Sequence, residues 1–200
     1  TYGAEHVLTA RASTPEVGQK LVDCIKWWED FAAGRGLVIN NNPSPGNKAG
    51  GLTTIIEKSL GSIAKGGTTN LNEVYGYAEE VEAGKGLVFM NAPAFDPVGA
   101  TAQVAGGANV MVFTTGRGSA FGCKPAPSIK LIDNTPMYQK MPDDMDINAG
   151  TILDGVETVE ECGQRIFERI IAVASGERTK SELLGYGEEE FCPWDLGIML

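Results

Sequence analysis

The sequence predicts an α/β fold, with a mostly parallel sheet and helices on both of its faces. Three short apolar runs, at 86–91, 109–113 and 128–132, have the continuous pattern of strands buried on both sides. Helical patterns alternate with these runs, as expected where parallel strands are joined by helical crossovers. At 200 residues the chain is long enough to form one domain with a substantial core.

Capping residues and apolar spacing predict the helices. Thr14-Pro15-Glu16 combines a capping hydroxyl, a proline at the first helical position and an early acid, so a helix is expected from there to Gly34. Capping boxes predict two later helix starts, at 158–161 and 179–182. The remaining predicted helices span 52–65 and 98–105, and the helix from 158 is expected to reach about Ala174.

Two segments carry weaker patterns. Leu37-Val38-Ile39 is apolar and β-branched, which favours a short strand before the loop that follows. Residues 70–77 are ambiguous between helix and strand, and their pattern slightly favours a helix.

Composition excludes several classes of partner and location. The net charge is −10 and there is no basic run, which argues against nucleic acid and anionic membranes as partners. No apolar run approaches the roughly 18 residues of a membrane helix, and no signal peptide is expected. Four widely spaced cysteines without a CxxC pair favour reduced thiols and a cytoplasmic protein.

Candidate binding loops follow the predicted strands, because ligands of open parallel sheets sit beyond the carboxyl ends of the strands. The candidate loops are 40–54, 91–97 and 114–123. In the last, Thr115, Arg117 and Ser119 offer two hydroxyls and a guanidinium, which suit a carboxylate or phosphate. The alternative is a tight turn that needs its two glycines. The loop matches neither a dinucleotide-binding motif nor a Walker loop.

The loop at 40–54 is dense in glycine, proline and hydrogen-bond donors. Asn42, Ser44 and Asn47 could bind carboxylate or hydroxyl oxygens, and Lys48 adds a cation. An acid and a base, Glu57-Lys58, follow about one helical turn later. The alternative interpretation is a surface loop with no ligand.

Two further places could contribute metal ligands. Residues 142–150 hold several carboxylates, of which Asp146 is the strongest candidate because it alternates with an amide at Asn148. Glu5 and His6 pair a carboxylate with the single imidazole of the chain. The alternatives are a solvated acidic turn and an incidental histidine. The sequence favours neither a structural zinc site nor a GxSxG hydrolase.

The most specific motif of the chain is Asn-Pro-Ser-Pro-Gly-Asn-Lys-Ala-Gly-Gly at 42–51. With the other motifs in register, it resembles the C-terminal catalytic region of the galactarate dehydratase/altronate dehydratase family of sugar-acid lyases, and the resemblance covers essentially all 200 residues. The starting Tyr-Gly-Ala-Glu-His and Ala-Phe-Gly-Cys at 120–123 resemble the galactarate branch more than the altronate branch. The other matching motifs lie at 57–61, 113–119, 144–150 and 174–182.

The resemblance implies an enzyme that removes water from an aldaric acid to give a keto-deoxy acid. It also implies a variant Rossmann-like sheet, and a divalent metal cofactor with Fe²⁺ as the expected ion. It further implies that residues 1–200 are a single C-terminal catalytic domain of a longer protein, whose N-terminal and intermediate regions precede it. The full-length protein is expected to form a homo-oligomer and to act on a small sugar acid.

Dehydration of a hydroxy acid needs a base, an acid and stabilisation of the enolate, and these needs suggest residue roles. Glu57 or Lys58 would transfer protons, with Lys48 as the rival base. Substrate binding is assigned to Asn42, Ser44, Asn47, Thr115, Arg117 and Ser119, and metal binding to Glu5, His6 and Asp146. The alternatives are an altronate dehydratase, a sulfolactate sulfo-lyase subunit, or a non-catalytic module that binds an anionic metabolite.

Overall fold

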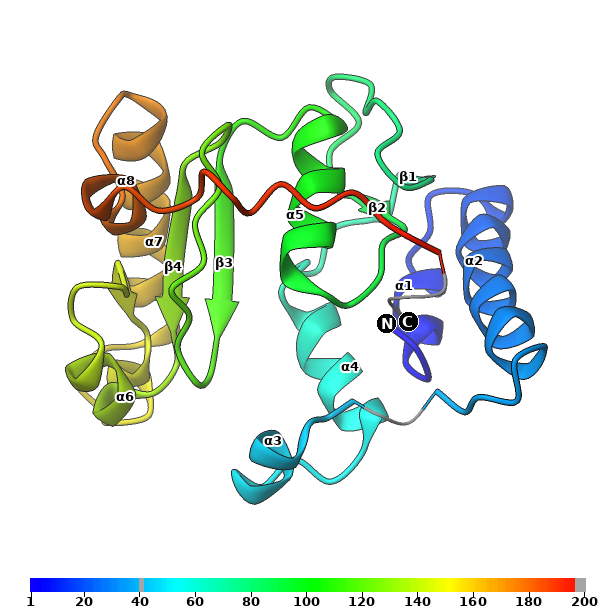
Figure 1. The fold of residues 1–200 in the computed structure, drawn as a ribbon, viewed down its shortest axis with the longest axis horizontal. Coiled ribbons are helices and arrows are strands. Elements are labelled where there is room, and N and C mark those ends of the chain that lie inside the picture. Colours follow the sequence, from blue (N-terminus) through cyan, green and yellow to red (C-terminus); the bar gives the residue numbers. More distant parts are fainter. Residues whose placement is uncertain (40–41, 197–200) are drawn as a thin grey trace. The chain divides into compact units, whose positions relative to one another are not determined.

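The computed structural model describes residues 1–39 and 42–196, and the chain divides into two compact units (Figure 1). Unit 1 comprises residues 1–92 together with Leu196, and unit 2 comprises residues 93–195. Both units contain helices and short parallel strands, which confirms the predicted α/β class. That the whole chain acts as one domain stays a prediction, and each unit is described by itself.

Unit 1 is mainly helical, with one pair of parallel strands. In β1 and β2 the central residues Val74 and Phe89 lie opposite each other. Val74 joins Leu8, Leu21 and Leu71 in a buried apolar core. The elements of unit 1 are α1 (Glu5–Thr9), α2 (Pro15–Ala33), α3 (Pro45–Ala49), α4 (Ile55–Ala64), β1 (Glu73–Tyr75) and β2 (Val88–Met90).

The capping signals place the long helix of unit 1 correctly. The Thr14 side chain accepts a hydrogen bond from the backbone N–H of Val17, and the helix ends before Gly34, as predicted. Helix α4 confirms the helix expected over 52–65 but begins at Ile55. The reason is that Thr54 caps it by accepting a hydrogen bond from the Glu57 N–H at 3.3 Å.

Two predictions for unit 1 are wrong. Residues 37–39 form no strand, and Val38 is 75% exposed, so no neighbouring strand covers this apolar run. Residues 70–77 do not form a helix; they contain β1, where parallel pairing with β2 buries Val74 and Tyr75. Pairing with a distant segment decides the second case, and the local pattern does not contain that information.

Unit 2 contains a three-stranded parallel sheet in the order β3-β4-β5. In its register Thr115 lies opposite Ile132, and Ile132 lies opposite Asn148. The elements of unit 2 are α5 (Asp96–Ala105), β3 (Met111–Thr115), β4 (Ser128–Ile132), α6 (Thr135–Lys140), β5 (Ile147–Asn148), a 3₁₀ turn (Gly150–Ile152), α7 (Val159–Ala174) and α8 (Lys180–Leu184).

Helices cover both faces of this sheet, as the sequence predicts. Met111 packs with Ala100 of α5 on one face. Ile129 and Ile147 pack with Val173 of α7 on the other. Figure 1 shows the sheet of unit 2 between these two helices. Unit 2 is therefore a three-layer α/β/α sandwich.

The two capping boxes of unit 2 are present. Thr158 and Thr179 each accept a hydrogen bond from the backbone N–H three residues later, and the glutamate carboxylate at that position accepts one from the backbone N–H of the threonine. Helix α6 was not predicted, although Asn134 caps it and Pro136 lies in its first turn. This Asn-x-Pro pattern is the signal that could have found it.

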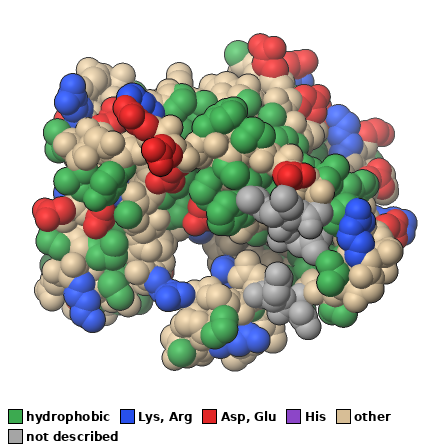
Figure 2. Space-filling model, in the orientation of Figure 1, with side chains coloured by type: hydrophobic (Ala, Val, Ile, Leu, Met, Phe, Trp, Pro, Cys, Tyr) green, Lys and Arg blue, Asp and Glu red, His purple; other side chains and the backbone are tan. Residues whose placement is uncertain are grey.

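Across the described ranges, no helix combines the length and the apolar character needed to cross a bilayer. On the face drawn in Figure 2, basic side chains are scattered among acidic and apolar ones.

Candidate functional site

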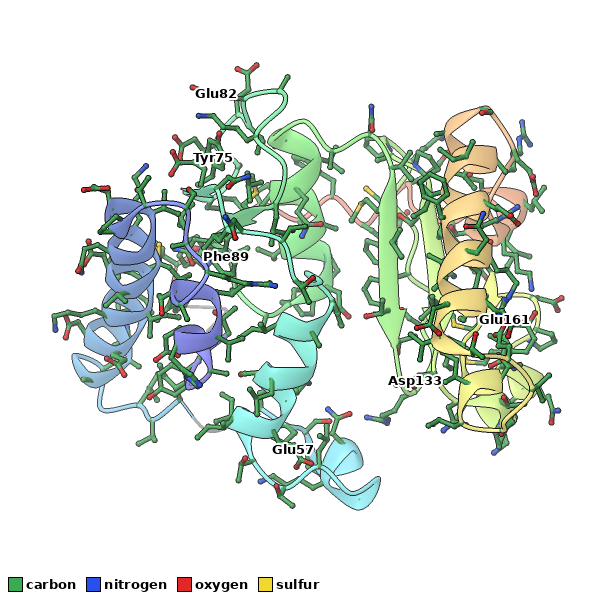
Figure 3. The ribbon with its side chains drawn as sticks, turned by 180° about the vertical axis from the view of Figure 1, so that it is seen from behind. Glu57, Tyr75, Glu82, Phe89, Asp133 and Glu161 are labelled. Carbon is green, nitrogen blue, oxygen red and sulfur yellow. The ribbon has the colours of Figure 1, made fainter. Side chains whose placement is uncertain are left out.

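The carboxyl edge of the unit 2 sheet brings together the ends of three strands. Strand β3 ends at Thr115 and continues into the loop that holds Arg117 and Ser119. Strand β4 ends at Ile132 and is followed by Asp133, which Figure 3 shows at the arrowhead end of the strands. The loop that the sequence singled out for anion binding therefore lies at the edge where open sheets bind ligands.

Within this loop, the hydroxyls stabilise the turn and the guanidinium stays available. Thr115 Oγ1 accepts a hydrogen bond from the backbone N–H of Arg117 at 3.3 Å, and Ser119 Oγ accepts one from the Phe121 N–H at 3.0 Å. The Arg117 side chain is exposed, and no hydrogen bond or ion pair within the described chain uses its guanidinium. Arg117 is thus the group of this loop that is free to bind an anion.

Gly118 also has a structural reason to be glycine. Its φ is +85°, and a Cβ there would collide with the sulfur of Met141 after helix α6. The alternative interpretation of the loop, a turn that needs glycine, is therefore correct at this position, and it coexists with an available Arg117.

Asp133 is a residue that the sequence reasoning missed. Its carboxylate is exposed and takes part in no hydrogen bond or ion pair with the described residues. A Cβ added at Gly116 would lie 3.3 Å from Asp133 Oδ1, so the carboxylate borders the Arg117 loop. The signal that could have found it is position, since Asp133 directly follows the predicted strand at 128–132.

A polar network beneath the edge fixes the end of β5. Asn148 Nδ2 donates to Thr135 Oγ1 at 2.9 Å, and Asn148 Oδ1 accepts from the Gly150 N–H at 2.9 Å. Arg165 Nη2 of α7 donates to the Asn148 carbonyl at 2.7 Å and also pairs with Glu157, which lowers the pKa of that carboxyl. The network joins the starts of α6 and the 3₁₀ turn to the end of β5.

The second candidate region is the loop before α4 in unit 1, of which residues 40–41 lie outside the described residues. Lys58 Nζ donates to Asn42 Oδ1 at 2.6 Å, so two residues that were predicted separately are brought together. The Asn42–Pro43 peptide bond is cis. Ser44 is the N-cap residue of α3, which carries Asn47 and Lys48.

Glu57 has a structural partner in the same region. Its Oε2 accepts hydrogen bonds from the backbone N–H and the hydroxyl of Thr53, at 2.7 and 2.6 Å. These two bonds lower the pKa of the Glu57 carboxyl. The residue lies at the start of α4 (Figure 3) and closes the first turn of that helix.

The proposed metal ligands belong to two different units. Glu5 and His6 are neighbours on α1 of unit 1, whereas Asp146 belongs to unit 2. No group of three or more His, Cys, Asp or Glu side chains in the described ranges is placed to hold a metal ion.

Asp146 instead has an internal set of partners. Its carboxylate is fully buried and accepts hydrogen bonds from the backbone N–H groups of Lys130 at 2.8 Å and Lys180 at 3.0 Å. Arg169 lies 3.3 Å from Oδ1 and neutralises the charge. This donor set does not fit a metal ion, since the oxygens already have partners.

The charged groups around Asp146 also line a cavity of about 580 Å³ near the amino end of β5. Most of these groups already have partners. Arg169 bonds both Asp146 and Glu177, and Lys180 Nζ donates to backbone carbonyls, including that of Met145 at 2.7 Å. The cavity therefore offers few free charges to a ligand.

Comparison with known proteins gives one family and several relatives. Residues 1–199 match the family described as D-galactarate/Altronate dehydratase, C-terminal. The chain is 44% identical to galactarate dehydratase (L-threo-forming) of Escherichia coli K12 over 175 residues, which cover 88% of this chain and 33% of that protein. It is 36% identical to altronate dehydratase of Bacillus subtilis 168 over 181 residues, covering 90% of this chain and 36% of that protein.

A relative with a different named activity also matches. The chain is 30% identical to the (2R)-sulfolactate sulfo-lyase subunit beta of Chromohalobacter salexigens over 189 residues, covering 93% of this chain and 48% of that protein. The chain thus spans about a third of the length of the two dehydratases above and about half of the sulfo-lyase subunit.

Proposed function

Because the chain belongs to the D-galactarate/altronate dehydratase family, we propose that it is the catalytic region of a hydro-lyase that dehydrates galactarate to a keto-deoxy acid. The observation that carries the choice of substrate is the 44% identity to galactarate dehydratase, against 36% to an altronate dehydratase. The family resemblance noted in the motifs of the sequence agrees with this membership.

The carboxyl edge of unit 2 supports the binding of an acid substrate. Arg117 carries a guanidinium without a partner in the described chain, and such a group binds a carboxylate through two parallel hydrogen bonds. Thr115 and Ser119 hold the turn that presents Arg117, and their hydroxyl oxygens can also contact the substrate. In this proposal Arg117 binds a substrate carboxylate and stabilises charge that develops on it as the alpha proton leaves.

Proton transfer is assigned to residues of unit 1. Of the adjacent residues Glu57 and Lys58, Lys58 is the stronger candidate for proton transfer, because its hydrogen bond to Asn42 fixes an amine beside the polar loop. Glu57 is the weaker one, because two hydrogen bonds from Thr53 favour its ionised form and hold it against the helix. Lys48 stays the rival base, and Asn42, Ser44 and Asn47 stay proposed as substrate contacts.

The family resemblance also implies a divalent metal, with Fe²⁺ as the expected ion. Since Asp146 is fully committed to internal partners, no step of the mechanism is assigned to a metal through Glu5, His6 and Asp146. The iron requirement stays part of the proposal as a condition to test. A small sugar acid as ligand and a homo-oligomeric full-length protein are proposed on the same basis. A cytoplasmic location stays proposed from the spacing of the cysteines, and the absence of nucleic-acid and membrane partners from the net charge.

Turnover by the complete natural polypeptide tests the proposal. Galactarate, altronate and sulfolactate would each be supplied with and without ferrous iron under reducing conditions, and keto-acid formation measured. Keto acid from galactarate alone supports the proposal, and iron dependence supports the metal. Turnover of altronate or sulfolactate in place of galactarate would show that the proposed substrate is wrong. Binding of an acid without turnover would favour a non-catalytic module.

The role of Arg117 has its own test. Arg117→Ala should raise KM for galactarate by roughly 10- to 100-fold, the effect expected when a charged hydrogen bond to substrate is lost. Arg178→Ala is the matched control, because it removes another exposed guanidinium of unit 2, near the amino end of β5. If the two variants have the same KM for galactarate, Arg117 does not bind the substrate.

A further inference from the structure

The carboxylate of Asp133 differs from those of Glu57 and Asp146 because it has no partner within the described chain. Glu57 accepts two hydrogen bonds from Thr53, and Asp146 is buried among backbone donors and Arg169. Asp133 is exposed and has no hydrogen-bonding or ionic partner in the described chain. All the lone pairs of its carboxylate are therefore available to a ligand.

The backbone that carries Asp133 is held firmly. On one side β4 ends at Ile132, which is paired with both neighbouring strands. On the other side Asn134 caps α6 by accepting from the Met137 N–H at 3.1 Å, and Thr135 is bonded to Asn148. A functional side chain needs this kind of support if it is to recognise the geometry of a ligand.

The space next to Asp133 is kept open by glycine. Gly116 follows β3 as Asp133 follows β4, and a Cβ at position 116 would lie 3.3 Å from Asp133 Oδ1. The neighbouring residue in the loop is Arg117, whose guanidinium is also without a partner in the described ranges. One edge of one sheet thus presents a free cation and a free anion from adjacent strand ends.

This combination suits a hydroxy acid. The guanidinium can bind the carboxylate of the acid, and the protein carboxylate can accept hydrogen bonds from its hydroxyls. A simple dicarboxylate has no such hydroxyls. We propose that Asp133 is a specificity-determining residue that accepts hydrogen bonds from substrate hydroxyls next to the carboxylate bound by Arg117. The inference rests on the proposed function and adds to it a residue that selects the hydroxyl configuration.

The test compares two epimers in the complete polypeptide. Galactarate and glucarate differ in the configuration of one hydroxyl, so their kcat/KM ratio measures hydroxyl recognition. Asp133→Ala should raise KM for the preferred epimer by roughly 10- to 100-fold, leave kcat within about threefold, and bring the ratio close to one. Asp133→Asn should keep part of the discrimination, because the amide oxygen still accepts a hydrogen bond.

Asp143→Ala is the matched control, since Asp143 is exposed and likewise has no partner in the described chain. It should leave KM and the ratio unchanged. If Asp133 had a merely structural role, Asp133→Ala would lower the thermal stability and change kcat/KM equally for both epimers. An unchanged ratio in Asp133→Ala, or a wild type that does not distinguish the epimers, would overturn the inference.

A binding measurement separates this inference from the proposed reaction. Calorimetric titration of wild type and Asp133→Ala with galactarate and with glucarate needs no turnover. If the wild type binds one epimer better and the variant does not, the inference stands even when no keto acid forms. If the wild type converts galactarate but Asp133→Ala keeps its selectivity, the function stands and the inference fails. If the wild type shows no binding and no turnover of either epimer, both the proposed function and this inference are overturned.

Discussion

Replacing Lys130 with methionine is expected to make unit 2 more stable. Lys130 lies in the middle of β4, its side chain is 0% exposed, and its Nζ has no hydrogen-bond partner among the described residues. The only ion pair of this amine in the described chain is with Asp144, at 4.0 Å. Burial lowers the pKa of the Lys130 amine in spite of Asp144 and other nearby carboxylates. The folded structure therefore disfavours the charged form of the Lys130 amine.

The size of the effect follows from two opposing contributions. Attraction between unit charges 4.0 Å apart amounts to about 4 kcal/mol at the effective dielectric of about 20 that suits proteins. Removing an ammonium from water costs several kcal/mol, and hydrogen bonds usually offset that cost but are missing here. Asp144 is 22% exposed, so it can be hydrated once the lysine is gone. Lys130→Met should therefore stabilise the fold by about 1–3 kcal/mol, which corresponds to roughly 2–12 °C in Tm.

Scanning calorimetry at pH 7 measures this change, with Lys140→Met as the control. Lys140 is an exposed residue of unit 2, so its replacement alters net charge equally and should shift stability by less than about 0.5 kcal/mol. The advantage of Lys130→Met should also shrink as pH rises. The pKa of Lys130 is lowered in the folded state, so between that value and the ordinary 10.5 the unfolded wild type binds more protons and wild-type stability increases with pH. A Lys130→Met variant that is less stable than wild type at pH 7 would refute the reasoning.

Three other changes test the supports of the same unit by urea unfolding. Asp146→Asn should lose about 3–5 kcal/mol, because a buried carboxylate that neutralises Arg169 is removed; an unchanged midpoint would leave Asp146 free for another role. Gly150→Ala should lose about 2–3 kcal/mol, since a Cβ there would collide with the backbone of Thr135. Thr158→Ala should lose about 1 kcal/mol with the capping box of α7, and Thr158→Ser should restore most of it.

Local signals predict much of the fold because their physics lies within a few residues. The helix starts at Thr14, Thr158 and Thr179 require only a side-chain oxygen and an N–H three residues away. The strand at 128–132 is correct to the residue because all five of its side chains are buried. Where the sequence prediction fails, the deciding contact is distant: β1 becomes a strand because β2, more than ten residues away, pairs with it.

The residues of the candidate site also differ in how far the sequence alone could predict their placement. The sequence could place Arg117 in a loop after a buried strand, and that position alone makes the loop a candidate for ligand binding. It could not show that Thr53 would engage Glu57, since that bond depends on where α4 begins. It also could not show which polar groups of the unit 1 loop would be brought together, as Asn42 and Lys58 are.

The carboxylates of unit 2 show why residue type alone does not identify function. Asp146 and Asp133 both adjoin strands of one sheet, and the sequence favoured Asp146 because an amide follows two residues later. In the structure Asp146 precedes β5 and is buried, where Arg169 and two backbone donors use its oxygens. Asp133 follows β4 and keeps its carboxylate free within the described chain. The amino and carboxyl ends of parallel strands lie at opposite edges of a sheet, and ligands bind at the carboxyl edge. Position relative to a strand is therefore the better guide: an acid before a strand favours a structural role, and an acid directly after one favours contact with substrate.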